Sequence, residues 1–229
     1  MASDESDDES INEQKSLISQ RAFSTARTFR DIIDRYLLYF EGKIPYLPTY
    51  FGELDPDTMA QLDMFKRINS LGLLTVNSQD GLIEDERNYE VIDNRTGEKI
   101  IYERIITKQR AYIDGYIEAR IYEQFQKFIS DTELLIFGVP VGTNKGVEFK
   151  REPYINVTSE ETWINGEYQY RPYTNLHVCS TGDEWDDIME WVSPKAKIPP
   201  LYYVQLLDPV WGRSNVLAET VIGALESIK

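Results

Sequence analysis

The sequence predicts one α/β or α+β domain in which mixed β-sheets are flanked by helices. Its 229 residues suit a single domain, and 41% of them are hydrophobic, which is ordinary globular usage. Segments of helical and of extended pattern also follow one another along the chain, as they do in folds that combine both. No repeat or long linker divides the chain. We therefore expect a disordered acidic tail over residues 1–15 and a domain over residues 16–229.

The first half of the domain shows three predicted elements in order. Residues 29–40 carry apolar side chains at spacings of three and four, which predicts an amphipathic helix. A second helix is expected to begin at Pro56, because proline suits a first helical turn, and to end at Gly72. The apolar residues of 73–76 follow directly and predict a short buried strand.

The second half begins with a predicted hairpin. Residues 89–92 and 99–102 are strand-like and flank a polar turn. A long helix is expected from about Thr107 to Ile129, because that segment has a broad apolar face. Further strands are expected at 134–139, 154–157, 168–170, 176–179 and 201–207, and further helices at 183–192 and 213–228.

The charge and composition argue against several classes of function. A net charge of −15 repels phosphate backbones and anionic lipids, so we expect neither a nucleic-acid nor a membrane partner. No apolar run approaches the roughly 18 residues of a membrane span, and the acidic start does not resemble a secretory signal. With Cys179 as the one cysteine, an internal disulfide is impossible. These features predict a cytoplasmic protein.

Side chains suited to catalysis are sparse. His177 is the one histidine, and Cys179 lies two residues further on, so both could share one face of a strand. Structural roles for the two are favoured over a nucleophilic Cys-His pair. The common metal-binding and phosphate-binding motifs are missing from the sequence. We therefore predict a protein without enzyme activity, metal or cofactor that acts by binding, with a protein partner.

Polar side chains follow the strand predicted at 73–76. Thr75 and Ser78 offer hydroxyl groups, and Asn77 and Gln79 add amides. Ligands of α/β folds tend to bind beyond the carboxyl ends of strands, where such groups converge. A ligand site is thus one interpretation, and ordinary turn and capping roles are the other.

The segment Phe65–Gln79, with sequence FKRINSLGLLTVNSQ, resembles the C-terminal regulatory domain of eukaryotic methylenetetrahydrofolate reductase. Asp57-Thr58 is similar to the acidic-Thr approach to that segment, and Gln109–Tyr112 is similar to the Gln-Lys-Ala-Tyr helix start of the family. The likeness extends faintly over residues 30–229. A Gly-Trp-Gly-Pro segment and the catalytic barrel of the family have no counterpart in this sequence.

In that family the regulatory domain does no chemistry and binds S-adenosylmethionine or S-adenosylhomocysteine. The resemblance therefore implies a ligand site made of Asp57, Thr58, Thr75, Ser78 and Thr162. Thr158 is the alternative to Thr162. The Asp57 carboxylate could pair with the ammonium group of the ligand, and the hydroxyls could hold its carboxylate.

A second hypothesis keeps the fold but not the ligand. The domain would then be a structural or protein-interaction module, for example an assembly or viral-particle component. Its 15 tyrosines suit an interface as well as a pocket.

Overall fold

The computed structural model describes residues 4–228 except 53, 55, 94, 143–153 and 178–183. Its class is mixed α+β, with seven helices and a curled half-barrel sheet of seven strands among the described residues. All pairings between these strands are antiparallel. The predicted combination of helices and sheet is confirmed, but the sheet is antiparallel and not mixed.

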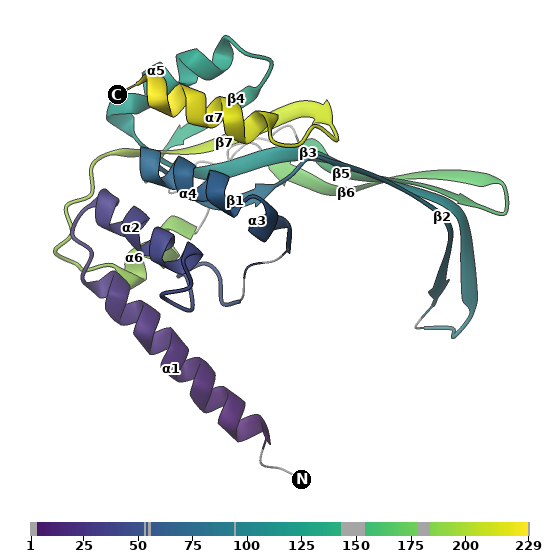
Figure 1. Cartoon of the computed structure of the whole chain (residues 1–229), viewed down its shortest axis with the longest axis horizontal. Helices are drawn as coiled ribbons and strands as arrows, with labels where there is room; N and C mark the ends of the chain where they lie inside the picture. The colour runs from purple at the N-terminus through teal and green to yellow at the C-terminus, as the bar shows by residue number, and fades with distance from the viewer. Residues whose placement is uncertain are drawn as a thin grey trace.

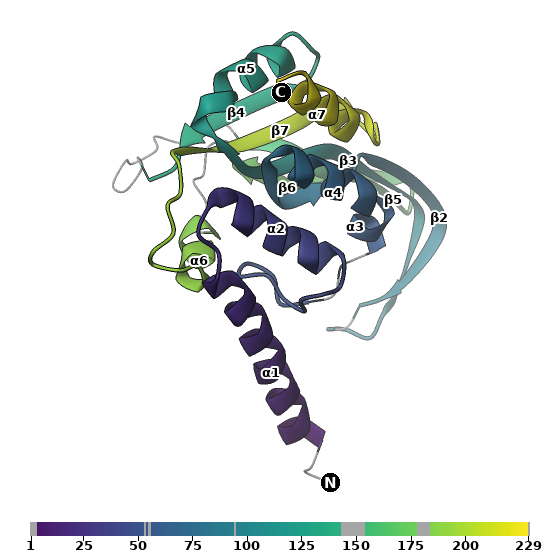
Figure 2. The same ribbon diagram turned by 60° about the vertical axis from the view of Figure 1, so that its left-hand side comes forward.

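The bounds of the elements define the labels of Figures 1 and 2. The helices are α1 Asp4–Ser24, α2 Phe29–Phe40, α3 Pro56–Ala60, α4 Leu62–Leu71, α5 Ala119–Ser130, α6 Glu184–Trp191 and α7 Val216–Ser227. The strands are β1 Leu73–Gln79, β2 Leu82–Ile92, β3 Lys99–Glu118, β4 Leu135–Pro140, β5 Tyr154–Ile164, β6 Glu167–His177 and β7 Leu201–Trp211.

Local signals place several elements as predicted. Helix α2 has the expected bounds, and a capping box between Thr28 and Asp31 starts it. The helix expected from Pro56 is interrupted at Gln61, which divides it into α3 and α4. It ends at Gly72, where φ is +110°, a left-handed conformation that glycine adopts without a steric penalty. The predicted hairpin is confirmed by the pairing of β2 with the start of β3.

The long helix predicted from Thr107 to Ile129 is wrong in its first half. Residues up to Glu118 belong to β3, and α5 begins only at Ala119. The reason is that Ala111–Ile117 is buried at every position, since this part of the strand is covered on both faces. Continuous burial removes the alternation that marks a half-exposed strand. The segment Gln109–Tyr112 therefore lies in a strand and not at a helix start.

Helix α1 begins at Asp4, within the segment over which the composition predicts a disordered tail. It extends away from the rest of the molecule in both views (Figures 1 and 2). Its C-terminal end is anchored, because Ser19 and Phe23 are fully buried. The Ser19 hydroxyl accepts a hydrogen bond from the Tyr46 backbone at 3.0 Å, and the Phe23 ring contacts Tyr36 and Trp191 edge-on.

Strand β3 is the axis of the sheet. Its C-terminal half pairs with β1 on one side and β7 on the other, and β4 follows β7. Helices cover both faces of this part. On one face Tyr202 of β7 stacks on Tyr122 of α5, with ring centroids 4.0 Å apart. On the other face Tyr203 lies 5.3 Å from Tyr116, whose ring contacts Trp185 of α6.

The N-terminal half of β3 has other neighbours and is more exposed than the C-terminal half. It pairs with β2 and β5, and β6 follows β5. These strands extend to the right of the helices in Figure 1, and the two hairpins diverge toward their tips. Residues 82–109 and 158–172 are called the arm below. Every residue of β2 except Val91 is exposed.

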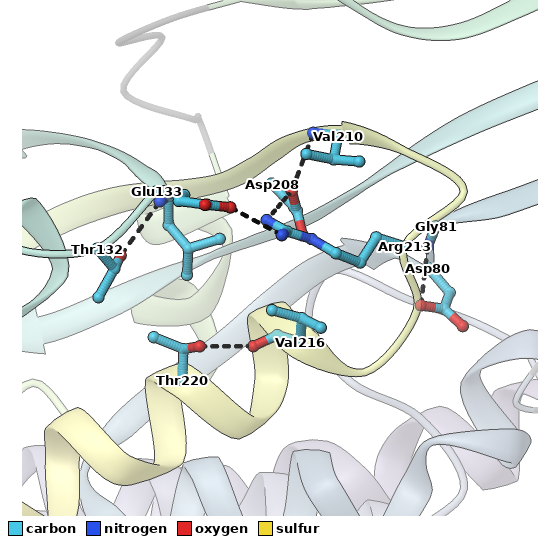
Figure 3. A network of polar contacts seen from close by, with 10 residues as sticks. Asp80, Gly81, Thr132, Glu133, Asp208, Val210, Arg213, Val216 and Thr220 are labelled. Atoms are coloured by element: carbon cyan, nitrogen blue, oxygen red, sulfur yellow. Dashed lines mark hydrogen bonds and ion pairs between the residues drawn. The ribbon is translucent and has the colours of Figure 1, made fainter.

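A buried ion pair holds the loop between β7 and α7 (Figure 3). Asp208 is fully buried and accepts two hydrogen bonds from Arg213, at 2.6 and 2.7 Å. Arg213 also donates to Glu133, in the turn after α5, at 2.9 Å. Arg213 therefore connects the loop both to β7, which the loop follows, and to the turn after α5.

Candidate ligand pocket

A pocket of about 320 Å³ lies at the free edge of β1, between this strand and helices α2, α3, α4 and α6. This volume is at the lower end of the range of roughly 300–1,000 Å³ that small-molecule sites occupy. Its wall combines aromatic, aliphatic, hydroxyl, amide and acidic side chains: Tyr39, Phe40, Leu47, Thr49, Tyr50, Leu54, Thr58, Phe65, Thr75, Val76, Asn77, Ser78, Glu184 and Asp187.

Three of the five predicted site residues line this pocket. Thr58 comes from α3, while Thr75 and Ser78 come from β1. Asp57 precedes Thr58 in α3, but its side chain lies outside the described part of the structure. Thr162 does not join them, because it is buried in the arm, where it pairs with Ile105.

The alternative to Thr162 lies closer to the pocket. Thr158 donates a hydrogen bond to the Gln79 side chain at 3.2 Å, and Gln79 is the last residue of β1. Gln79 in turn donates to the backbone oxygens of Arg110 and Val157, at 3.0 Å each. Thr158 thus helps to fix the end of the strand that carries Ser78, without lining the pocket itself.

Asn69 on α4 sets the position of Thr75. Its amide nitrogen donates to the Thr75 hydroxyl at 2.6 Å and to the Phe65 carbonyl at 2.9 Å. Its amide oxygen accepts from the Thr75 backbone at 3.3 Å. Because the hydroxyl oxygen already accepts from Asn69, its proton is directed elsewhere and can be donated to a ligand.

The pocket has an acidic character. Glu184 and Asp187 of α6 are both in its wall, and the residues of that wall include no lysine, arginine or histidine. A cationic ligand group is therefore favoured electrostatically over an anionic one. The sequence does not point to these two residues, because the acidic start of α6 has the pattern of an ordinary solvated helix face.

A buried polar cluster lies near Glu184. Burial raises the pKa of Asp114, on β3, to about 7, and the charge of Glu184 adds to this effect, while hydrogen bonds from Tyr203 and Gln205 oppose it. Within the described residues, one carboxylate oxygen of Asp114 and the hydroxyl of Tyr116 have no hydrogen-bond partner. Burial also raises the pKa of Tyr116, with Glu184 as the next cause. Unpartnered buried groups of this kind are places where water or a polar ligand atom binds.

The two side chains considered for nucleophilic chemistry, those of His177 and Cys179, are not described by the structure. His177 ends β6, but its side chain, like all of Cys179, lies outside the described residues. No group of three potential metal-ligating side chains is found in the described ranges. In the same ranges, no helix has the length and apolar character needed to cross a membrane.

Together these features define a helix-covered α+β domain with an acidic, hydroxyl-rich pocket at the edge of its sheet. Residues 18–228 match the model of the family described as a domain of unknown function, DUF6919, and the chain belongs to that family. A comparison with curated proteins finds no match.

Proposed function

We propose that this protein is a non-catalytic ligand-sensing domain, related in fold to the regulatory domain of methylenetetrahydrofolate reductase. Its pocket would bind S-adenosylmethionine, S-adenosylhomocysteine or a related small molecule. The observation that carries the proposal is that Thr58, Thr75 and Ser78 line a single pocket. These are three of the five residues that the sequence resemblance implies for a ligand site. The single cysteine further favours a cytoplasmic site of action.

The side chains of the pocket suit such a ligand. The sulfonium and ammonium groups of S-adenosylmethionine are cations, and Glu184 and Asp187 supply carboxylates. The rings of Tyr39, Phe40 and Tyr50 offer surfaces on which an adenine could stack. A second cavity of about 620 Å³ shares Tyr39, Phe40 and Leu54 with the first, so a ligand larger than the first cavity has further room.

Isothermal titration calorimetry of the full chain with each of the two adenosyl ligands tests the proposal. We expect a Kd in the micromolar range, equivalent to about −8 kcal/mol. Ser78→Ala and Thr58→Val should each weaken binding at least about tenfold, because each removes one polar contact. Ser70→Ala is the matched control, since Ser70 is an exposed residue of α4 that does not line the pocket. An absence of heat at millimolar concentrations of both ligands would contradict the proposal.

A second candidate function, a protein-interaction module, is favoured by a different feature. The arm exposes large apolar side chains on strands that no helix of the described structure covers. Both functions could reside in one chain, because the pocket lies at β1, which pairs with the C-terminal half of β3, and the arm is built on the N-terminal half of β3.

A further inference from the structure

The arm exposes apolar surface that the domain itself does not use. Sixteen large apolar side chains are exposed in the described part of the chain, and seven of them lie on the arm: Leu82, Ile83, Tyr89, Ile92, Ile101, Tyr168 and Tyr170. Exposed apolar groups that gather on one element are typical of an interaction site. Within the arm, Ile105, Ser159 and Thr162 are buried, whereas every residue of β2 except Val91 is exposed. A binding partner would therefore bury apolar surface that the domain itself leaves in contact with water.

The strand register sorts these side chains onto two different faces, because directly paired residues point to the same side of a sheet. One face contains the row Arg87, Arg104, Trp163 and Tyr168, which runs across all four strands. The next row on this side is Asp85, Ile106, Glu161 and Tyr170, and Tyr89 pairs with Tyr102 further out. We call this side the aromatic face.

The opposite side has a different composition. Its rows across the four strands are Glu84, Thr107, Glu160 and Arg171, and then Glu86, Ile105, Thr162 and Gln169. Further out, Glu90 pairs with Ile101, and Ile92 pairs with Lys99. We call this side the acidic face. It combines exposed aliphatic side chains with carboxylates.

The two faces differ in charge. On the aromatic face, Asp85 is paired with Arg104 at 2.7 Å and Glu161 is paired with Lys108, which leaves Arg87 as an additional cation. The acidic face carries six carboxylates and two cations, namely Glu84, Glu86, Glu90, Glu103, Glu160, Glu167, Lys99 and Arg171. Glu90 is paired with Lys99 at 2.7 Å, and the carboxylates still outnumber the cations by four. Aromatic and arginine side chains are the ones that contribute most to protein interfaces.

We propose that the aromatic face of one copy of this chain packs on the acidic face of a second copy. Charge decides between the possible pairings. Two acidic faces would bring twelve carboxylates together, and two aromatic faces would leave Arg87 of each copy without an added carboxylate. The aromatic-on-acidic pairing places Arg87 against glutamates such as Glu84 and Glu86, and tyrosines against Ile92 and Ile101. A nucleic acid fits less well, because Arg104 and Lys108 are already neutralised.

This pairing is head to tail, since the two contacting surfaces are different. The four-stranded part of the arm spans about six residues per strand, or roughly 20 Å by 20 Å at ordinary sheet spacings. Roughly 400 Å² per face is about half of what each partner buries in a standard interface. We therefore expect weak association that increases with protein concentration and is weakened by salt.

Sedimentation velocity of the full chain over a concentration series tests the proposal, with two double variants. Tyr168→Ala/Tyr170→Ala removes two exposed rings from the aromatic face, and Glu84→Lys/Glu86→Lys reverses two charges on the acidic face. We expect the wild type to associate and each variant alone to be monomeric. An equimolar mixture of the variants should form a dimer and nothing larger, because each retains the face that the other has lost.

The controls are Phe128→Ala and Glu123→Lys, which change exposed residues of α5, and both should associate like the wild type. Circular dichroism would confirm that all variants fold. A wild type that remains monomeric at millimolar concentration would overturn the proposal. So would double variants that still associate, or a mixture of them that stays monomeric. None of these results depends on ligand binding in the pocket.

Discussion

The carboxylate of Asp208 holds the guanidinium of Arg213 through two hydrogen bonds, at 2.6 and 2.7 Å, although the two residues belong to the end of a strand and the loop after it. Asp208 also accepts from the Val210 backbone at 2.9 Å (Figure 3). One fully buried carboxylate thus accepts three hydrogen bonds, which together define the conformation of the loop that leads to α7.

Asp208→Ala should therefore destabilise the protein by about 3 kcal/mol, because it removes three hydrogen bonds of a buried carboxylate and leaves Arg213 with only the exposed Glu133 as its partner. Glu133→Gln should cost less than about 1 kcal/mol, since Glu133 is 77% exposed and its contact with Arg213 is screened by water. Urea denaturation of the two variants measures the difference. Equal losses of stability would mean that burial of Asp208 does not set the strength of this pair.

Gly115 is required where β1 approaches β3. A Cβ atom at this position would lie well inside van der Waals contact distance of the Leu74 carbonyl oxygen, so Gly115→Ala should cost about 1–3 kcal/mol. Gly223 in α7 is the matched control, since nothing lies within 4 Å of an added Cβ. Gly223→Ala should stabilise the helix by about 0.5–1 kcal/mol. Shifts of the urea midpoint in the same direction for both variants would contradict this account.

Asp114 should make stability depend on pH. Its pKa is about 7 in the folded protein and near its ordinary value of 3.8 after unfolding, so the folded state binds the extra proton between these values. Stability from this group is thus complete below about pH 4 and is lost as the pH rises to about 7. Asp114→Asn should remove this component, up to about 4 kcal/mol at pH 8. Urea midpoints of both proteins from pH 4 to 8 test it, and parallel curves would contradict it.

Thr75 has both a structural and a proposed ligand-binding role, and two substitutions separate them. Thr75→Val removes the acceptor of the Asn69 amide, which is buried, so stability should fall by about 1–3 kcal/mol along with any ligand affinity. Thr75→Ser keeps the hydroxyl and should retain most of both. Calorimetry and urea denaturation measured in parallel make the comparison. A valine variant as stable as the wild type would argue against the role of the Asn69 contact.

Much of the fold could be predicted because local signals define it. The cap at Thr28, the proline at the start of α3 and the glycine after α4 act within a few residues. Strand β3 could not be predicted in full, because its C-terminal half is buried on both faces and has the pattern of a helix with a broad apolar side. Whether such a segment is a strand depends on β1 and β7, which the segment itself does not specify.

The residues of the pocket also divide into those that local sequence can predict and those that only the packing of distant segments brings together. Thr75 and Ser78 lie in the segment Phe65–Gln79, and Thr58 lies in the Asp57-Thr58 pair shortly before it, so a resemblance over these two neighbouring segments could find all three. Glu184 and Asp187 enter from α6, far along the chain, and only the packing of that helix brings them to the pocket. The resemblance implies Thr162 for the site, with Thr158 as the alternative, and the structure places Thr162 in the arm.

The twenty residues of β3 form one strand, roughly 65 Å long at 3.3 Å per residue. Its C-terminal half is packed between helices, and its N-terminal half lies in the arm, paired with β2 and β5. Mechanically the arm is a cantilever. A load at its tip bends it most at the root, near Arg110–Tyr112, where the register with β7 is irregular. The last residues of β1 are hydrogen-bonded to β3 at this root. Any torque on the arm is therefore delivered to the strand that carries Thr75 and Ser78.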